Sequence, residues 1–361
     1  MSTGVLLLNF GEPSEPDRDA VVQYLSLIFR ANADLDDAPD PEVRARELAE
    51  RRAPGLLAEY EEIGGSPLNA QARAQSERLH DRLQDRGHEV ETFIGMQYTA
   101  PFVEDAVAAA AAEGIDDLIA LPSYPLCGPS TTVLALEELQ EALDEGVPRG
   151  REGGGGGGGG DLDVQEVTGW HRHPRYRELR ADSVREFVDD CGVDLDEPDT
   201  ALVFSAHGTP RHYLEAGSRY DQYVREHCSA MGERLGVDDS HLGYQNHENR
   251  DIPWTEPEVE DLVEDLAAAG HERVVVDPIS FVHEQSETLM ELDVDLREAA
   301  EDAGLAFHRV PVPHDDPRLD RTFADLVEPF LGGADPAEAG FARCECRDRP
   351  GTMCLNAPHT V

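Results

Sequence analysis

The stretch Ala201-Leu-Val-Phe-Ser-Ala-His-Gly-Thr-Pro210 decides the fold that we predict for this chain. Its apolar first half is typical of a buried parallel strand, and the small residues after Phe204 let the backbone turn. In an open α/β sheet, ligands bind outside the carboxyl ends of the strands. His207 is therefore predicted to lie where such folds carry out chemistry, although a solvated loop histidine fits the same pattern.

Short apolar strands alternate with helices on both sides of this stretch. We therefore predict an α/β fold of two tandem Rossmann-like domains, each a doubly wound parallel sheet, with the active site in the cleft between them. Eight consecutive glycines, from Gly153 to Gly160, predict a flexible insertion near the boundary. The predicted bounds are 1–148 for the N-terminal domain, 149–162 for the Gly-rich insertion, 163–333 for the C-terminal domain and 334–361 for a Cys-containing extension.

The composition is strongly acidic, with 75 Asp and Glu against 30 Lys and Arg, for a net charge of −45 over 361 residues. Such a surface repels nucleic acid and anionic lipid, so neither is an expected partner. The acidic residues are spread over the whole chain, which is typical of a protein from a halophile, where high salt screens self-repulsion. We see no secretory signal and no apolar run long enough to cross a membrane. A cytoplasmic protein without a stable membrane anchor is expected.

A second pattern follows the predicted strand at 273–277. Glu284, Glu287 and Glu291 recur at helical spacing, so the three carboxylates are predicted to share one helix face. In so acidic a chain this could be a solvated stripe. However, the stripe follows a strand end that should face the same cleft as His207. An imidazole and a carboxylate that meet there could bind a divalent metal or take protons from a ligand.

Several motifs together resemble the ferrochelatase family. They occur in the family's order and are Leu6-Leu-Leu-Asn-Phe-Gly-Glu-Pro13, Ile63-Gly-Gly-Ser-Pro-Leu68, Gly95-Met-Gln-Tyr98, Phe204-Ser-Ala-His-Gly-Thr-Pro210, and Pro278-Ile-Ser-Phe-Val282 with Glu287-Thr-Leu-Met-Glu-Leu-Asp293. The resemblance implies insertion of Fe²⁺ into a porphyrin, either protoporphyrin IX or coproporphyrin III, to form haem with release of two protons. A related chelatase for cobalt, or a haem- or iron-binding protein without turnover, is the alternative.

The resemblance also implies roles for individual residues. His207 resembles the histidine that binds metal or takes a pyrrole proton, Glu287 the carboxylate that faces it, and Glu291 the next acidic residue of the helix. Gln285 stands where many members have a histidine, so that histidine is missing here, and His283 is two residues away. The candidate porphyrin contacts are Phe10, Tyr124 and Trp254, which follow strand ends and could equally be core aromatics, and Arg30, which could pair with a propionate.

Three of the six cysteines lie close together near the C-terminus, at Cys344, Cys346 and Cys354. In a cytosolic chain this spacing favours metal over disulfide. Some ferrochelatases have three such cysteines and one internal cysteine, which together hold a [2Fe–2S] cluster. The resemblance therefore implies Cys127 as the fourth ligand, with structural zinc or free thiols as the alternatives. Cys191 and Cys228 are predicted to be plain buried thiols. Neighbouring enzymes of the haem pathway are the expected protein partners.

Overall fold

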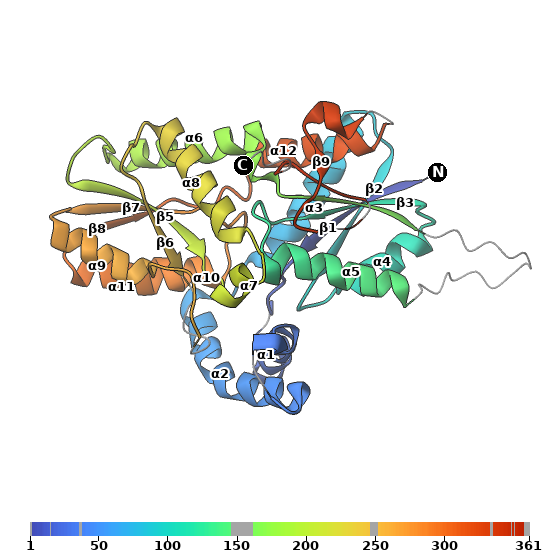
Figure 1. The fold of residues 1–361 in the computed structure, drawn as a ribbon, viewed down its shortest axis with the longest axis horizontal. Coiled ribbons are helices and arrows are strands. Elements are labelled where there is room, and N and C mark those ends of the chain that lie inside the picture. Colours follow the sequence, from blue (N-terminus) through green and yellow to red (C-terminus); the bar gives the residue numbers. More distant parts are fainter. Residues whose placement is uncertain are drawn as a thin grey trace, which may run out of the picture.

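The computed structural model describes residues 2–14, 16–35, 38–145, 162–245, 252–332, 335–347, 349 and 351–356. Two α/β units lie side by side, each built around its own sheet (Figure 1). The prediction of tandem parallel sheets is therefore confirmed. Apart from Leu162, the predicted Gly-rich insertion lies outside the described residues.

The first sheet has the strand order β2-β1-β3-β4-β10-β9. Its first four strands are parallel, and its edge is completed by two short strands from the C-terminal extension, of which β9 runs antiparallel to β10. β1 lies in the middle of the parallel part and is apolar along almost its whole length, because helices cover both faces of the sheet. The bounds are β1 (Thr3–Asn9), β2 (Val90–Met96), β3 (Asp117–Pro122), β4 (Asp163–Thr168), β9 (Ala342–Arg343) and β10 (Thr352–Cys354).

The second sheet is parallel throughout and has the order β6-β5-β7-β8. The central strand β5 (Thr200–His207) is buried up to its last residue, His207, which is half-buried. His207 therefore stands at a carboxyl end of the sheet, as predicted. The neighbouring strands are β6 (His241–Gln245), β7 (Arg273–Pro278) and β8 (Ala306–Arg309).

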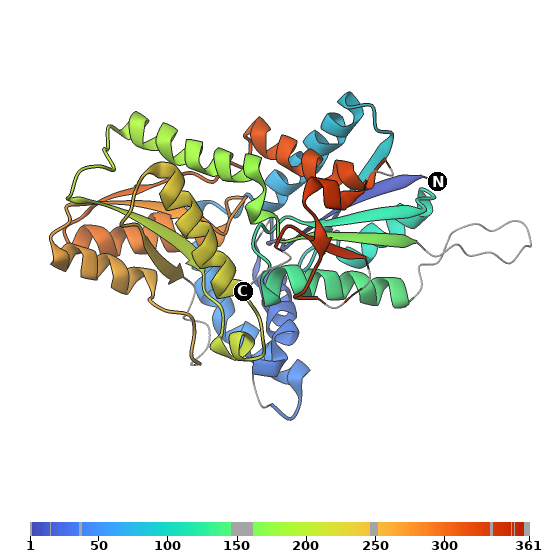
Figure 2. The same ribbon diagram turned by 45° about the horizontal axis from the view of Figure 1, so that its top comes forward.

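Helices cover both faces of both sheets (Figures 1 and 2). On the first sheet, α4 (Val103–Ala112) and α5 (Leu134–Asp144) pack on one face, and α3 (Leu68–Asp85) and α12 (Pro317–Val327) on the other. On the second sheet, α6 (Pro174–Cys191) and α8 (Tyr220–Leu235) oppose α9 (Val259–Ala269) and α11 (Arg297–Asp302). Two short helices follow strand ends of the second sheet, α7 (Arg211–Glu215) and α10 (Ser286–Leu289).

The predicted boundary between the two domains is wrong at both ends of the second domain. β4 was assigned to the C-terminal domain, but it pairs with β3 in the first sheet. α12 was assigned there as well, but Leu319 and Phe323 pack in the core under the first sheet, beside Leu7. The chain thus leaves the first unit only after β4 and returns to it after β8. Local periodicity predicts a strand or a helix, but it does not say which sheet the element joins.

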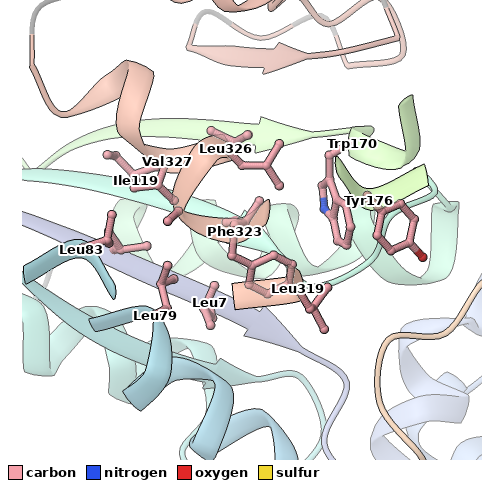
Figure 3. Close-up of a cluster of buried hydrophobic side chains, with 14 of the residues drawn as sticks. Leu7, Leu79, Leu83, Ile119, Trp170, Tyr176, Leu319, Phe323, Leu326 and Val327 are labelled. Atoms are coloured by element: carbon pink, nitrogen blue, oxygen red, sulfur yellow. The ribbon is translucent and has the colours of Figure 1, made fainter. Parts of the chain in front are cut away.

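The core under the first sheet is centred on an aromatic group (Figure 3). The Trp170 ring meets Tyr176 and Phe323 edge to face, at centroid distances of 4.8 and 5.3 Å. The indole N–H donates to the carbonyl of Pro122 at 3.0 Å, so the buried polar atom of this ring is satisfied. Such fully buried side chains each contribute about 1.5–3 kcal/mol by leaving water.

A helical hairpin, α1 (Arg18–Ala31) and α2 (Pro41–Ile63), projects from the sheet units on the side of α10 (Figure 1). Each helix starts at an aspartate whose carboxylate accepts a backbone N–H, Asp17 from Ala20 at 2.9 Å and Asp40 from Val43 at 3.2 Å. Among the described residues, no helix combines the length and the apolar character that crossing a membrane requires.

Candidate active site

The central pair of the site is His207 and Glu287, which come from β5 and α10. The imidazole Nε2 lies 3.0 Å from Glu287 Oε1, and the two side chains are 35% and 17% exposed. The other ring nitrogen, Nδ1, is 2.6 Å from the carbonyl of Gly208. The backbone N–H of His207 donates to Ser280 Oγ at 3.0 Å. Because both ring nitrogens face acceptors, the arrangement favours the doubly protonated imidazolium.

The electrostatics agree with this geometry. Burial by itself lowers the pKa of His207, but the charge and hydrogen bond of Glu287, with a further contribution from Glu291, outweigh it and raise the pKa to about 9. At neutral pH the pair is therefore an imidazolium and a carboxylate.

Glu291 lies one helical turn beyond Glu287, as the spacing predicted. Gln245, the last residue of β6, donates from Nε2 to Glu291 Oε2 at 3.0 Å and to the Glu287 carbonyl at 2.7 Å. Burial and the negative charge of Glu287 raise the pKa of Glu291 to about 8. A carboxyl group with such a pKa can take up and release protons near neutral pH.

The prediction of three carboxylates on one face is wrong for Glu284. Its carboxylate faces away from His207, accepts from Arg309 Nη1 at 2.6 Å and from the backbone N–H of Val312 at 2.9 Å, and is buried. The helical spacing was misleading here because α10 begins only at Ser286. Glu284 therefore precedes the helix and follows the path of the loop.

Gln285, at the position where many family members have a histidine, and the nearby His283 have different surroundings. Gln285 donates a hydrogen bond from Nε2 to Glu287 Oε2, so it orients the carboxylate that faces His207. His283 is buried, contacts Asn9 Nδ2 through Nδ1 at 3.2 Å, and has its pKa lowered to about 3 by burial. It is neutral at physiological pH and points into the domain contact.

The candidate porphyrin residues come from separate parts of the chain. Phe10 follows β1 and packs edge to face against Tyr98 and Tyr24, at 4.6 and 6.3 Å between centroids. Tyr124 follows β3 and donates from its hydroxyl to Gln97 Oε1 at 3.0 Å. Trp254 pairs with Pro210, three residues beyond His207. Arg30 is exposed in the last turn of α1.

Among the four cysteines implied as cluster ligands, Cys127, Cys346 and Cys354 each interact with Cys344. The thiols of Cys346 and Cys354 lie in hydrogen-bonding contact with Cys344 and lower its pKa. Burial, with a further contribution from the charge of Cys344, raises the pKa of Cys127 to about 12. Tyr223 of α8 approaches Cys346 Sγ to 2.6 Å, so the extension also touches the second unit.

The described residues nevertheless contain no group of three or more His, Cys, Asp or Glu side chains arranged to hold a metal ion. This applies to the cysteines and to the pair of His207 and Glu287, whose side chains are turned toward each other. Cys228 is buried as predicted, but Cys191 is exposed, so that prediction is wrong. Cys191 is the last residue of α6.

Fold and site together define a two-domain α/β protein with a histidine–carboxylate centre between its sheets. SirB from Bacillus subtilis, solved with Fe³⁺, has a similar fold, with a TM-score of 0.50 at 11% identity over 94% of this chain and 98% of SirB. The model of the ferrochelatase family matches residues 2–330. The chain belongs to the ferrochelatase family, and it is a metal chelatase.

Curated relatives support the same conclusion. The ferrochelatase of Nostoc sp. is 34% identical over 340 residues, covering 90% of this chain and 81% of the relative. The ferrochelatase of Picosynechococcus sp. is 35% identical over 336 residues, covering 91% and 82%. That of Synechococcus sp. strain JA-3-3Ab is 32% identical and covers 93% and 95%.

Sequence reasoning missed several residues that shape the site. Gln245 could have been found, because it ends a strand next to β5 and so lies at the same sheet edge. Ser280 had a weaker signal, as a hydroxyl in the loop after β7. Tyr220, whose hydroxyl donates to the His207 carbonyl at 3.0 Å, begins a helix, and its sequence context gives no indication of this contact.

Proposed function

We propose that this site inserts Fe²⁺ into a porphyrin to form haem, with release of two protons, and that His207, Glu287 and Glu291 perform the chemistry. The observation that carries the proposal is the contact of 3.0 Å between His207 Nε2 and Glu287 Oε1. A base and a metal-binding carboxylate meet there at a strand end, and both are needed to replace two N–H protons by a cation.

The proposed sequence begins with the imidazolium–carboxylate pair. Fe²⁺ that binds Glu287 offsets the negative charge that raises the pKa of His207. The pKa of His207 then falls, so the imidazolium loses its proton and becomes a base. The neutral imidazole then takes protons from the pyrrole N–H groups as the porphyrin nitrogens bind the iron. Two of the four porphyrin nitrogens carry a proton. These two N–H bonds break while all four nitrogens bind the iron, so two protons leave for each Fe²⁺ that enters.

Glu291 is proposed to carry these protons away from the pair. Its raised pKa of about 8 suits a group that alternates between the protonated and ionised forms. Gln245 donates to both Glu291 and the Glu287 backbone, which fixes the position of the two carboxyl groups relative to each other. Gln285 cannot relay a proton as an imidazole would, and we assign it the orientation of Glu287 instead.

The porphyrin is proposed to lie against Phe10, Tyr124 and Trp254, with Arg30 paired to a propionate. Support comes from their places after β1, after β3 and beside the loop that follows His207. Phe10 has no hydroxyl, so an axial oxygen ligand cannot come from this position.

The direct test is anaerobic Fe²⁺ insertion in multimolar KCl, with protoporphyrin IX and coproporphyrin III offered in parallel. Turnover by the wild type, with loss of about 10²–10⁴-fold in His207→Ala, is the expected result for a residue acting as base. Turnover of one porphyrin alone would identify the substrate. A folded protein that uses neither porphyrin, or a His207→Ala variant with unchanged turnover, would refute the proposal. Turnover with Co²⁺ alone would point to the related cobalt chelatases.

We also propose that Cys127, Cys344, Cys346 and Cys354 hold a [2Fe–2S] cluster. Four thiolates are the ligand set that such clusters require, and the proposal is supported by the interactions of Cys127, Cys346 and Cys354 with Cys344. The thiols must still rearrange, since they do not form a metal-holding group as they stand. Two iron and two acid-labile sulfide per chain, lost in Cys344→Ser, are expected. A content of one zinc per chain without sulfide would refute the cluster and indicate a structural zinc site instead.

A high-salt cytoplasm is the proposed setting. The net charge of −45 supports it, because such a surface is tolerated best where salt screens repulsion. Delivery of porphyrin by a neighbouring enzyme of the haem pathway stays a prediction. Co-purification at multimolar KCl with the preceding enzyme would test it.

A further inference from the structure

Glu12 is a buried carboxylate to which the proposed chemistry assigns no role. It follows Gly11 in the turn after β1, and its side chain is almost completely buried. Oε1 accepts from the hydroxyls of Tyr60, at 3.2 Å, and Ser286. Oε2 accepts from the Ser66 hydroxyl and from the backbone N–H of Ser286, at 3.2 Å.

These donors come from three separate parts of the fold. Tyr60 lies on α2, Ser66 in the loop before α3, and Ser286 is the first residue of α10, 274 positions away in the sequence. The backbone of Glu12 is fixed as well, because Asn69 Oδ1 accepts its N–H at 3.0 Å and Asn69 Nδ2 donates to its carbonyl at 2.7 Å. The carboxylate is thus a rigidly held acceptor for the start of α10.

The electrostatic cost of this arrangement indicates a purpose beyond packing. The four groups that donate to the Glu12 carboxylate are neutral: three hydroxyls and one backbone N–H. Burial and the nearby charge of Glu287 raise the pKa of Glu12. A buried carboxyl group held by neutral donors is expensive and is retained only where its hydrogen bonds matter. Here two of the four bonds go to one residue, Ser286, whose neighbour in the chain is Glu287.

Two further contacts seat the same segment on the first unit. Asn9 Nδ2 lies 3.2 Å from His283 Nδ1, and the backbone N–H of Glu284 donates to Gln71 Oε1 at 2.8 Å. The entry to α10 is therefore held by residues of the first unit, whereas His207 belongs to the second sheet. The relative position of Glu287 and His207 depends on how α10 docks across this boundary.

We propose that Glu12 is a positioning residue for metal insertion: its carboxylate docks the first turn of α10 on the first unit and thereby sets Glu287 opposite His207. This inference rests on the proposed function for its effect on turnover. Its structural part, the docking of α10, is independent of that function.

The test compares Glu12→Ala and Glu12→Gln with Asp320→Ala as the matched control. Asp320 is also a buried carboxylate of the first unit, but it lies on α12 and pairs with Arg78 at 3.0 Å. In Glu12→Ala we expect kcat for Fe²⁺ insertion to fall 10- to 100-fold, as removal of a geometric constraint does. Affinity for metal-free porphyrin, from fluorescence titration, should change less than threefold. The Glu12→Gln substitution keeps an acceptor oxygen, so this variant should recover most of the turnover.

Hydrogen exchange provides a readout that does not depend on activity. The amides of Thr288, Leu289 and Met290 are bonded within the first turn of α10, and they should exchange faster in Glu12→Ala but not in Asp320→Ala. A wild type without turnover would refute the proposed function, and the exchange data would still decide the docking.

The proposal is overturned if Glu12→Ala keeps kcat within threefold, or if α10 exchange is unchanged. It is also overturned if Asp320→Ala lowers kcat equally. Should Glu12→Ala fail to fold, Ser286→Ala replaces it, because it removes the hydroxyl that donates to Glu12 Oε1. A fall in kcat together with faster exchange of the α10 amides in Ser286→Ala supports the docking, and an unchanged kcat or unchanged exchange refutes it.

Discussion

The Glu287→Gln substitution tests the electrostatic core of the site. It keeps the size of the side chain and one acceptor oxygen, but it removes the charge that most strongly favours the His207 imidazolium. In the wild type the pKa of His207 is raised to about 9. Without Glu287, burial is opposed only by Glu291 and the Gly208 carbonyl, so we expect the pKa of His207 to fall from about 9 toward its ordinary value of 6.5.

The magnitude follows from the two pKa values. A complete fall from about 9 to 6.5 corresponds to about 3.5 kcal/mol, which is an upper bound, since one pKa unit is about 1.4 kcal/mol. The His207 side chain is 35% exposed, so solvent screening reduces the effect. We therefore expect about 1–2 kcal/mol.

The sign can be checked through stability as well as titration. Because the pKa of folded His207 lies above its unfolded value, the pair stabilises the wild type fully below about pH 6.5, and this contribution is lost as the pH rises through 9. In Glu287→Gln, the free energy of unfolding should not show this decrease between pH 6.5 and pH 9. The assay is NMR titration of the histidine ring signals, with the His207 resonance assigned from His207→Ala, alongside urea denaturation at pH 6 and 9.5. A wild-type His207 that titrates at or below 6.5, or a titration unchanged by Glu287→Gln, would refute the reasoning.

Three further perturbations test the fold and the setting. Phe323→Ala should destabilise the protein by about 3–5 kcal/mol in urea denaturation, because it leaves a cavity in the core shown in Figure 3. The control Val43→Ala, at an exposed site, should cost less than about 0.5 kcal/mol. Equal effects of the two substitutions would contradict the assigned core. Asp277→Ala should cost about 3–5 kcal/mol, because it leaves the fully buried Arg180 without its carboxylate, and Glu50→Ala, which breaks the exposed pair with Arg46, is the control. The melting temperature should rise between 0.1 and 2 M KCl, where the screening length falls from about 10 Å to below 3 Å; a rise of the same size in sucrose at equal osmolality would argue against charge screening as the cause.

Much of the architecture could be predicted from the sequence because it depends on local patterns. Short apolar runs that end in small residues specify buried parallel strands, and His207 stands at a strand end for that reason. The i, i+4 spacing of Glu287 and Glu291 places both on the same side of one helical segment, as the structure has them. The family motifs added the reaction, since residue types at fixed positions carry information that periodicity does not.

Tertiary structure decided what depends on contacts between distant segments. Glu284 has the helical spacing of the site carboxylates, yet the helix begins two residues later and the side chain pairs with Arg309. From the sequence, β4 and α12 are predicted to belong to the second domain, but both belong to the first. β4 forms hydrogen bonds with the exposed edge of the first sheet, and α12 buries its apolar face against that sheet. Glu12 reaches Ser286 across 274 residues, a distance over which no sequence pattern specifies which donor a buried carboxylate meets. Local sequence determined which elements form, and packing determined which side chains they bring together.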